Sequence, residues 1–133
     1  ARTLRWLHQW RQARPRQGRG PAVLADPAGI VHEMRLYKDA TEIDLMRASA
    51  AIARAAHGEA LRRARPGMRE FEIEALLDGA FRRHGASAPA YPSIVAAGAN
   101  ATILHYVDNA ARLDAGDLLL IDAGAELSGY ASD

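Results

Sequence analysis

The sequence of 133 residues contains no cysteine. This absence excludes disulfide bonds and thiolate metal ligands, so any bound metal would need oxygen or imidazole ligands. Long apolar runs are missing too. No uncharged apolar stretch approaches the roughly 20 residues that span a bilayer, and the arginine-rich start lacks the apolar core of a signal peptide. We therefore expect a cytoplasmic protein without membrane contacts.

Acidic residues are absent from the first twenty positions, which contain six arginines: Arg2, Arg5, Arg11, Arg14, Arg16 and Arg19. Arginines neutralise phosphates and indole rings stack on bases, so this segment with Trp6 and Trp10 is compatible with nucleic-acid binding. The alternative is a short amphipathic helix, with Leu4, Leu7 and the tryptophans on its apolar side. A loop rich in Pro and Gly would follow at residues 15–21. We favour the helix and expect no nucleic-acid partner.

The composition, 49% hydrophobic, is that of a folded domain with its own core. Short extended pieces are predicted at residues 22–25 and 30–34, on either side of a turn sequence at 26–29. A domain boundary is predicted near residue 35, ahead of a long helical pattern.

The first long helix is predicted to begin at Thr41 and to run to about Arg65. Thr41 and Asp44 have the spacing of a capping box, and Pro66 followed by Gly67 stops the helix. One apolar stripe, rich in alanine so that another element can approach closely, consists of Ile43, Met46, Ala50, Ala53, Ala60 and Ala64.

A second helix is predicted from about Glu70 to His84, with Gly85 at its C-terminal cap. Its positions with core spacing are Ile73, Leu76, Leu77, Ala80, Phe81 and His84.

Strand patterns follow the helices. We predict strands at residues 93–97, 102–106 and 118–122, with a turn at 98–100 between the first two. Because helices come first and strands later, the pattern indicates the α+β class.

Two aspartates, Asp122 and Asp133, lie in a stretch that predicts a strand, a turn and a return strand. If Leu127 and Ser128 form a two-residue loop, the pairing continues until Asp122 faces Asp133 on the same side of the hairpin. Like charges directly opposite each other repel, and an apolar strand is a poor environment for an unpaired charge. We interpret the pair as half of a metal site.

Two alternatives remain open for these residues. A bulge at Gly129 would shift the pairing by one residue and re-aim Asp133. Alternatively, Asp122 only ends the strand and caps the turn near Gly124, and Asp133 is a polar residue without a role.

From His32 onward the chain contains motifs that are weak individually and specific in combination. They are residues 32–38 (HEMRLYK), 42–43 (EI), 46–47 (MR), 65–68 (RPGM), 91–95 (YPSIV), 103–106 (ILHY), 116–117 (GD), 120–124 (LIDAG) and 129–130 (GY). In this order and spacing they resemble the Xaa-Pro aminopeptidase (aminopeptidase P) branch of the metallopeptidases with the pita-bread fold. The similarity covers about a hundred residues.

The resemblance implies the first half of a pita-bread catalytic domain, similar to creatinases and aminopeptidases, with two helices packed on an antiparallel sheet. Residues 35–133 would form this half-domain. Residues 1–34 would be the tail of the family's N-terminal domain and its linker.

The resemblance also implies a centre of two divalent metal ions, typically manganese, held by two aspartates, one histidine and two glutamates. Asp122 matches the aspartate that chelates one ion, and Asp133 matches the aspartate that bridges both. A water between the ions would attack the scissile carbonyl. Oxygen ligands suit manganese, with magnesium, cobalt or zinc as alternatives.

His105 matches the family's active-site histidine, which contacts substrate and is not a metal ligand. We predict a catalytic and substrate-binding role for it, because an imidazole there can hydrogen-bond the peptide. Without the resemblance, a histidine after an apolar run is typical of a core position. Tyr91 is predicted to line the substrate pocket, with aromatic packing as the alternative. The other histidines, at positions 8, 32, 57 and 84, are predicted to be structural.

The family's remaining histidine and glutamate ligands have no counterpart in this sequence. Two carboxylates cannot build a five-ligand centre for two metals, so we expect the chain alone to be inactive. An isolated half of this fold exposes the face that its twin covers. We therefore expect either the missing C-terminal half as a partner or self-association, and a homo-oligomer for the parent protein.

The function implied for the parent protein is release of the N-terminal residue from peptides with proline in second position. The alternatives are a prolidase or another creatinase-like hydrolase, and a non-catalytic pita-bread module that binds proteins.

Overall fold

The computed structural model describes residues 2–13 and 25–133. The chain forms two compact units, Ala1–Tyr37 and Lys38–Asp133. The first unit contains α1 (Arg2–Ala13), the helix expected for the arginine-rich start, and α2 (Ala28–Leu36). No helix among the described residues has the length and apolar character needed to cross a membrane.

The extended piece predicted at residues 30–34 is wrong, because these residues belong to α2. Ile30 and Val31 favour strands by propensity. However, Pro27 has a helical φ of −73° immediately before the helix, and the Asp26 side chain accepts a hydrogen bond from the Ala28 amide at 2.9 Å. The helix-start signals at Asp26 and Pro27 therefore outweigh the strand preference of the two β-branched residues. Residues 22–24 of the other predicted piece lie outside the described part.

The long helix of the second unit, α3 (Ala40–Arg63), starts slightly earlier than predicted. Its cap is Asp39, whose Oδ1 accepts a hydrogen bond from the Glu42 amide at 2.8 Å, while Glu42 Oε2 accepts one from the Asp39 amide at 2.7 Å. This is a complete capping box. The pairing of Thr41 with Asp44 is therefore wrong, because Asp39 offers the same chemistry two residues earlier.

The buried face of α3 is rotated relative to the predicted stripe. Ala53 and Ala60 are buried as expected, but Ile43, Met46 and Ala50 are exposed. The buried set consists of Ser49, Ile52, Ala53, Ala56 and Ala60. The small side chains on this face allow α3 to pack closely on α4 (Glu70–Arg83) and on the strands.

Helix α4 follows its prediction closely. Ile73, Leu77, Ala80 and Phe81 are fully buried, and Gly85 has a φ of +98° just beyond the helix end. Of the other predicted core positions, Leu76 is half-buried and His84 is exposed. A left-handed residue after the last turn is the usual helix stop, and glycine adopts it without strain.

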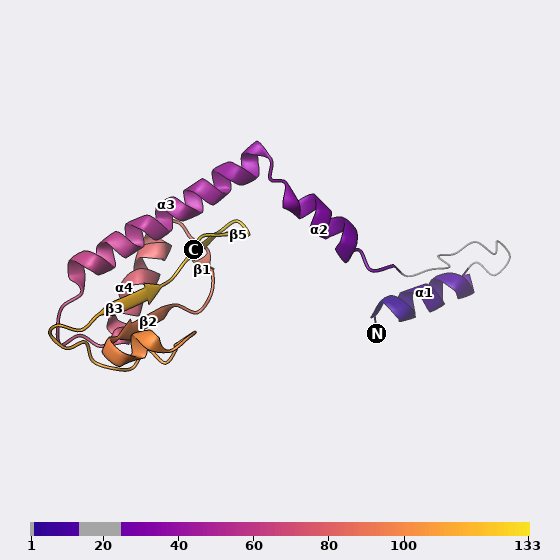
Figure 1. Ribbon diagram of the computed structural model, residues 1–133. Coiled ribbons are helices and arrows are strands. Elements are labelled where there is room, and N and C mark those ends of the chain that lie inside the picture. Colours follow the sequence, from indigo (N-terminus) through magenta and orange to yellow (C-terminus); the bar gives the residue numbers. More distant parts are fainter. Residues whose placement is uncertain (1, 14–24) are drawn as a thin grey trace. The chain divides into compact units, whose positions relative to one another are not determined.

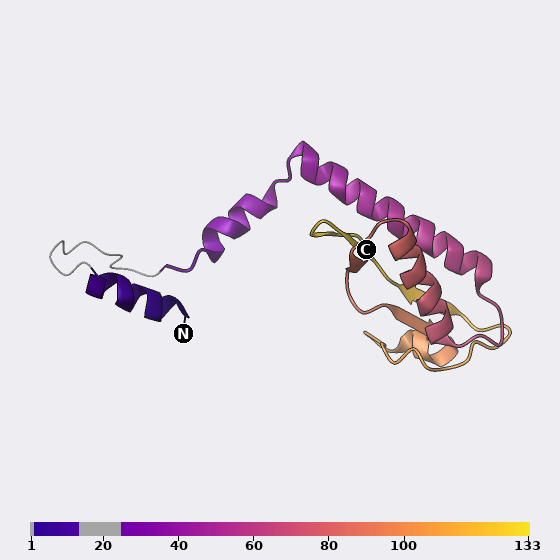
Figure 2. The same cartoon turned by 180° about the vertical axis from the view of Figure 1, so that it is seen from behind.

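Five short strands form two antiparallel sheets. One sheet pairs β2 (Ile94–Ala97) with β3 (Leu119–Asp122), and the other has the order β1 (Ala88–Pro89), β4 (Ala125–Leu127), β5 (Tyr130–Ala131). Figures 1 and 2 show α3 and α4 on one side of these strands. The second unit is thus of the expected α+β class.

The strand predicted at residues 102–106 is wrong. The 3-10 helix η1 (Gly98–Thr102) and a turn occupy this segment, and His105 has a φ of +55°. The polar groups here bind Glu70 instead of a sheet partner: Asn100 Nδ2 donates to Glu70 Oε1 at 3.0 Å, and the Tyr106 hydroxyl donates to Glu70 Oε2 at 2.7 Å. A buried carboxylate therefore overrides the strand propensity of the segment.

Candidate metal and substrate site

The C-terminal hairpin has a different register from the predicted one. Leu127 pairs with Tyr130, and Glu126 pairs with Ala131. The two-residue loop is therefore Ser128–Gly129, with φ values of +51° and +85°. Hairpin loops of this length favour positive φ at both positions, which leucine resists and a Ser-Gly pair accepts.

This register moves the predicted pairing by two positions along one strand. Asp122 is therefore not directly opposite Asp133. Asp122 lies in β3, which belongs to the other sheet, so the pairing of β4 with β5 does not determine the side to which it points. The predicted register is wrong, but the two carboxylates do lie close together, because both contact the same tyrosine hydroxyl.

The hydroxyl of Tyr91 connects the two aspartates. It lies 2.7 Å from Oδ1 of Asp122 and 2.6 Å from Oδ1 of Asp133. A phenol carries one hydrogen, so it can donate to only one carboxylate at a time. Burial, reinforced by hydrogen bonds to Asp133 and Asp122, raises the pKa of Tyr91 above its ordinary value. The tyrosine therefore remains a neutral donor between two acids.

Gly124 makes this close arrangement sterically feasible. A Cβ atom at this position would stand 1.9 Å from the carbonyl oxygen of Ser132 and 3.1 Å from a ring carbon of Tyr91. The absent side chain thus admits both the residue before Asp133 and the tyrosine that touches both carboxylates.

Helix α3 fixes the backbone between the two sheets. His57 Nε2 lies 2.7 Å from the carbonyl oxygen of Ala123, so this nitrogen must carry the ring hydrogen. The buried Ser49 hydroxyl donates to the carbonyl oxygen of Ala125 at 2.8 Å. Asp122 therefore ends β3 beside a segment that α3 holds at two points, and His57 has the structural role expected for it.

Strand alternation places Asp122 on the side of the β2–β3 sheet away from the main core. Leu119 and Ile121 pack against that core, whereas Leu120 and Asp122 line a cavity of about 260 Å³. The other walls of this cavity are Ile94, Ala101, Thr102, Ile103, Leu104 and His105. The structure thus brings His105 and Asp122 to one cavity, although His105 lies on a turn and not on the predicted strand.

Glu70 anchors the segment that carries His105. Its side chain is fully buried and accepts four hydrogen bonds, from the amides of Ala97 and Ala111 and from the side chains of Asn100 and Tyr106. Burial alone would raise the pKa of Glu70, but these donors outweigh it and lower the pKa below the ordinary value. Residues 97–111 are thereby tied to the start of α4.

Two parts of this site were not found from the sequence. Glu70 has the appearance of an ordinary acid in the first turn of a helix, and no local signal shows that it accepts bonds from residues up to 41 positions away. The contact of Tyr91 with both aspartates spans 31 and 42 positions. Only the fold reveals such long-range pairs.

The donor set around Tyr91 suits a hard divalent cation in kind, since two carboxylates meet where a single hydrogen cannot satisfy both. The number of ligands is small. Among residues 2–13 and 25–133, no three acidic or histidine side chains are grouped to hold a metal ion. Asp122 and Asp133 therefore fit as two oxygen ligands of a centre that needs more.

Comparison with protein families gives a match over residues 44–133 to the family described as "Metallopeptidase family M24". The Xaa-Pro aminopeptidase of Escherichia coli K12 is 46% identical over 113 residues, which are 85% of this chain and 26% of that protein.

Solved structures give the same result. Aminopeptidase PepP of Pseudomonas aeruginosa matches with a TM-score of 0.91 and 45% identity, over 98% of this chain and 30% of that one. Aminopeptidase P from Escherichia coli with the inhibitor Pro-Leu matches with a TM-score of 0.90 and 42% identity, again over 98% and 30%. The chain spans less than a third of the length of these relatives.

Proposed function

Because the chain belongs to metallopeptidase family M24, we propose that it carries part of the active site of a metal-dependent Xaa-Pro aminopeptidase. Its fold is the first part of the pita-bread fold of aminopeptidase P. The observation that carries the proposal is the convergence of Asp122 and Asp133 on one tyrosine hydroxyl, beside a cavity that Asp122 shares with His105.

In this proposal Asp122 and Asp133 hold two divalent ions, with manganese as the expected metal. Further ligands would come from outside the described residues. Bound cations polarise a carbonyl and make water a nucleophile at neutral pH. Tyr91 keeps both aspartates in position by contacting each of them.

The contribution of His105 is to bind the substrate peptide. This residue lies on a turn at the wall of the cavity, and the hydrogen bonds that Tyr106 and Asn100 donate to Glu70 hold the neighbouring backbone. An imidazole nitrogen there can donate a hydrogen bond to the carbonyl that becomes negative during hydrolysis.

The proposed substrates are peptides with proline in second position. Their Xaa-Pro bond is a tertiary amide without an N–H group and with a fixed φ, so pockets that require this donor reject it. The names of the relatives support this specificity, and the Escherichia coli enzyme was solved with the dipeptide Pro-Leu as inhibitor.

The test is hydrolysis by the natural full-length protein, after removal of metal and readdition of manganese. We expect release of the first residue from Xaa-Pro-Xaa but not from the matched Xaa-Ala-Xaa peptide, and loss of turnover with chelator. Cleavage confined to the Xaa-Pro dipeptide would instead identify a prolidase. Absence of both turnover and manganese binding would support a non-catalytic binding module.

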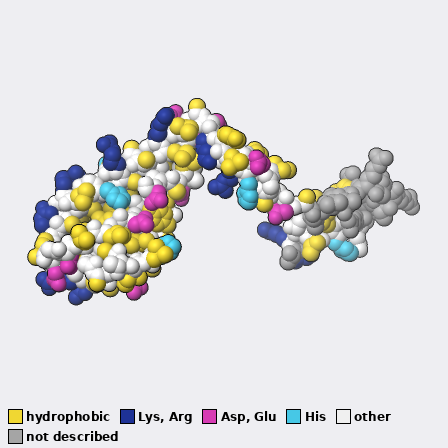
Figure 3. Space-filling view, viewed as in Figure 1, with side chains coloured by type: hydrophobic (Ala, Val, Ile, Leu, Met, Phe, Trp, Pro, Cys, Tyr) yellow, Lys and Arg dark blue, Asp and Glu magenta, His cyan; other side chains and the backbone are white. Residues whose placement is uncertain are grey.

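We also propose that the cavity side of the β2–β3 sheet is covered by further polypeptide, either a second half-domain or another copy of the chain. Large apolar side chains reach the surface in this unit (Figure 3), with Leu104 exposed by 85% and Leu118 by 80%. Large exposed leucines next to a candidate site are typical of a surface that another polypeptide covers. A homo-oligomer of the whole protein is part of this proposal.

A further inference from the structure

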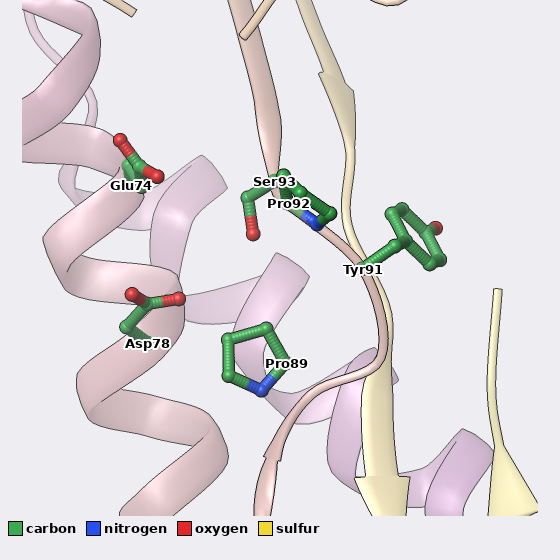
Figure 4. A pocket seen from close by; sticks show the side chains of 6 residues that line it. All are labelled: Glu74, Asp78, Pro89, Tyr91, Pro92 and Ser93. Carbon is green, nitrogen blue, oxygen red and sulfur yellow. The ribbon is translucent and has the colours of Figure 1, made fainter. Parts of the chain in front are cut away.

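A second cavity, of about 290 Å³, lies between α4 and the segment that connects β1 to β2. Glu74 and Asp78 line it from the helix, and Pro89, Tyr91, Pro92 and Ser93 line it from the segment. In Figure 4 the Ser93 hydroxyl and both carboxylates point into the space between these walls, while the Tyr91 ring extends to the far side. The family match assigns no role to this cavity.

Two side-chain atoms of residues that line this cavity are buried and have no hydrogen-bond partner among the described residues. They are Oγ of Ser93, a residue only 3% exposed, and Oδ1 of Asp78. A buried polar atom without a partner costs roughly 1–3 kcal/mol. In native structures most such atoms bind an ordered water or a ligand.

The acidic side chains of the cavity indicate that a group bound there would carry a positive charge. Glu74 and Asp78 are four residues apart on one helix, where like charges destabilise each other. Burial, and then the charge of Glu74, raise the pKa of Asp78 above its ordinary value. A cation that donates hydrogen bonds would relieve both effects.

We propose that this cavity binds a guanidinium group. A planar guanidinium offers five N–H donors in a fork that matches carboxylates, so it can satisfy Asp78 Oδ1, Ser93 Oγ and Glu74 together. Its faces are weakly hydrated and stack well on flat apolar groups. Pro89 and Pro92 supply such walls.

A metal ion fits this cavity less well. It contains two carboxylates and no histidine, and the described residues hold no group of three metal-binding side chains. A compact, strongly hydrated ammonium group would leave part of the cavity unfilled and would gain less from the proline walls. The guanidinium belongs either to an arginine side chain of a polypeptide or to a free small molecule.

The site also adjoins the candidate metal centre through Tyr91. Tyr91 is one of the residues that line the guanidinium cavity, and its hydroxyl contacts Asp122 and Asp133. An occupant of the cavity would therefore contact the segment that carries this tyrosine. The inference does not depend on the proposed peptidase activity.

The experiment measures binding of Nα-acetyl-arginine methylamide to the protein by calorimetry or by NMR titration. The citrulline counterpart, which has the same shape without the charge, and the lysine counterpart serve as comparison ligands. We expect at least tenfold weaker binding of the citrulline compound and weaker binding of the lysine compound. Methylguanidinium gives the second arm: tighter binding of the arginine compound identifies a polypeptide source, and equal affinity identifies a free small molecule.

Three variants locate the site. Asp78→Asn and Glu74→Gln should each weaken arginine binding at least fivefold, and Ser93→Ala should weaken it about twofold. Asp44→Asn, which removes the same charge from an exposed residue that pairs with Arg47, should leave the affinity unchanged. Thermal unfolding would verify that each variant is folded. Equal binding of citrulline, or unchanged affinity in both Asp78→Asn and Glu74→Gln, would overturn the proposal.

Discussion

Asp122 and Asp133 present two acceptors to a tyrosine that has one hydrogen to give. The hydroxyl hydrogen can therefore satisfy only one of the two carboxylates at a time. The arrangement therefore favours ion binding over stability. Such unfavourable electrostatic interactions are common at functional sites, where a bound ligand relieves them.

The substitution Asp122→Asn tests this balance. We expect it to abolish manganese binding in the natural full-length protein, because an amide oxygen is a weaker ligand and its NH₂ group repels cations. The apo protein should change in stability by no more than about 0.5 kcal/mol, since one of two neighbouring negative charges is removed. Metal analysis together with thermal unfolding measures both effects.

Asp114→Asn is the matched control for this prediction, because Asp114 is an exposed acid in a turn of the same unit. It should retain full metal content. Retention of manganese by Asp122→Asn would contradict the assignment of Asp122 as a ligand.

Glu70 gives a second residue-scale prediction. Glu70→Gln replaces two acceptor oxygens by one oxygen and one donor, so part of the network from Ala97, Asn100, Tyr106 and Ala111 must break. We expect a loss of about 3 kcal/mol in the free energy of unfolding at pH 7, because buried bonds to a charged group are lost. Urea unfolding, with the exposed Glu33→Gln as control, measures this difference.

The pH dependence of the same variant follows from linkage. The pKa of Glu70 is lowered by folding from a model-peptide value of 4.5, so its stabilisation is fully present above that pH and is lost as the pH falls through the folded-state value. We expect the wild-type protein to lose stability below pH 4.5 more steeply than Glu70→Gln. Parallel acid-unfolding curves for the two proteins would contradict this role.

At the scale of elements, the junction between β3 and β4 determines how the two sheets meet. Ala123 and Gly124 form this junction, and Gly124 leaves no room for a side chain. Gly124→Ala should lower the free energy of unfolding by about 3 kcal/mol or more, because the obstacle is the rigid backbone of Ser132. It should also displace Asp133 and weaken metal binding.

The control is Gly29→Ala, at a helical position where an added Cβ meets no atom within 4 Å. This change should be neutral or stabilising by up to about 1 kcal/mol, since alanine favours the helix. Equal effects of the two substitutions in chemical denaturation would mean that Gly124 is not sterically required.

Elements with local signals were predictable from the sequence, whereas elements set by distant partners were not. Helix α4 and the strand before Asp122 follow from their apolar spacing and end signals. The segment around His105 was predicted as a strand because its residues favour one, but Glu70 imposes a turn from another part of the chain. The predicted hairpin loop was wrong by one position. The correct position depends on whether Leu127 or Gly129 takes a positive φ, and Gly129 does.

The sequence named candidate site residues but did not give their arrangement in space. Asp122, Asp133 and His105 came from motif spacing, and each lies at the Tyr91 contact or at the adjoining cavity. Their roles in metal and substrate binding stay predictions. The anchoring by Glu70 and the cavity behind Tyr91 required three-dimensional information, because they join residues from separate elements.

For the whole molecule, the exposed leucines lead to a prediction about association. We expect the 133-residue chain to self-associate or to retain a companion polypeptide, because Leu104 and Leu118 are too exposed for a stable isolated surface. Leu104→Lys combined with Leu118→Lys should shift it toward a soluble monomer. Light scattering after size-exclusion chromatography measures the mass, and a wild-type monomer at every concentration would refute the prediction.

The two aspartates lie on opposite sides of the junction between the two sheets. Asp122 is the last residue of the β2–β3 sheet, and Asp133 follows β5 in the other sheet. An ion bound by both aspartates would join the two sheets, so its loss should destabilise the C-terminal hairpin first. Chelation would then be visible as faster amide exchange in β5, well before the rest of the fold opens.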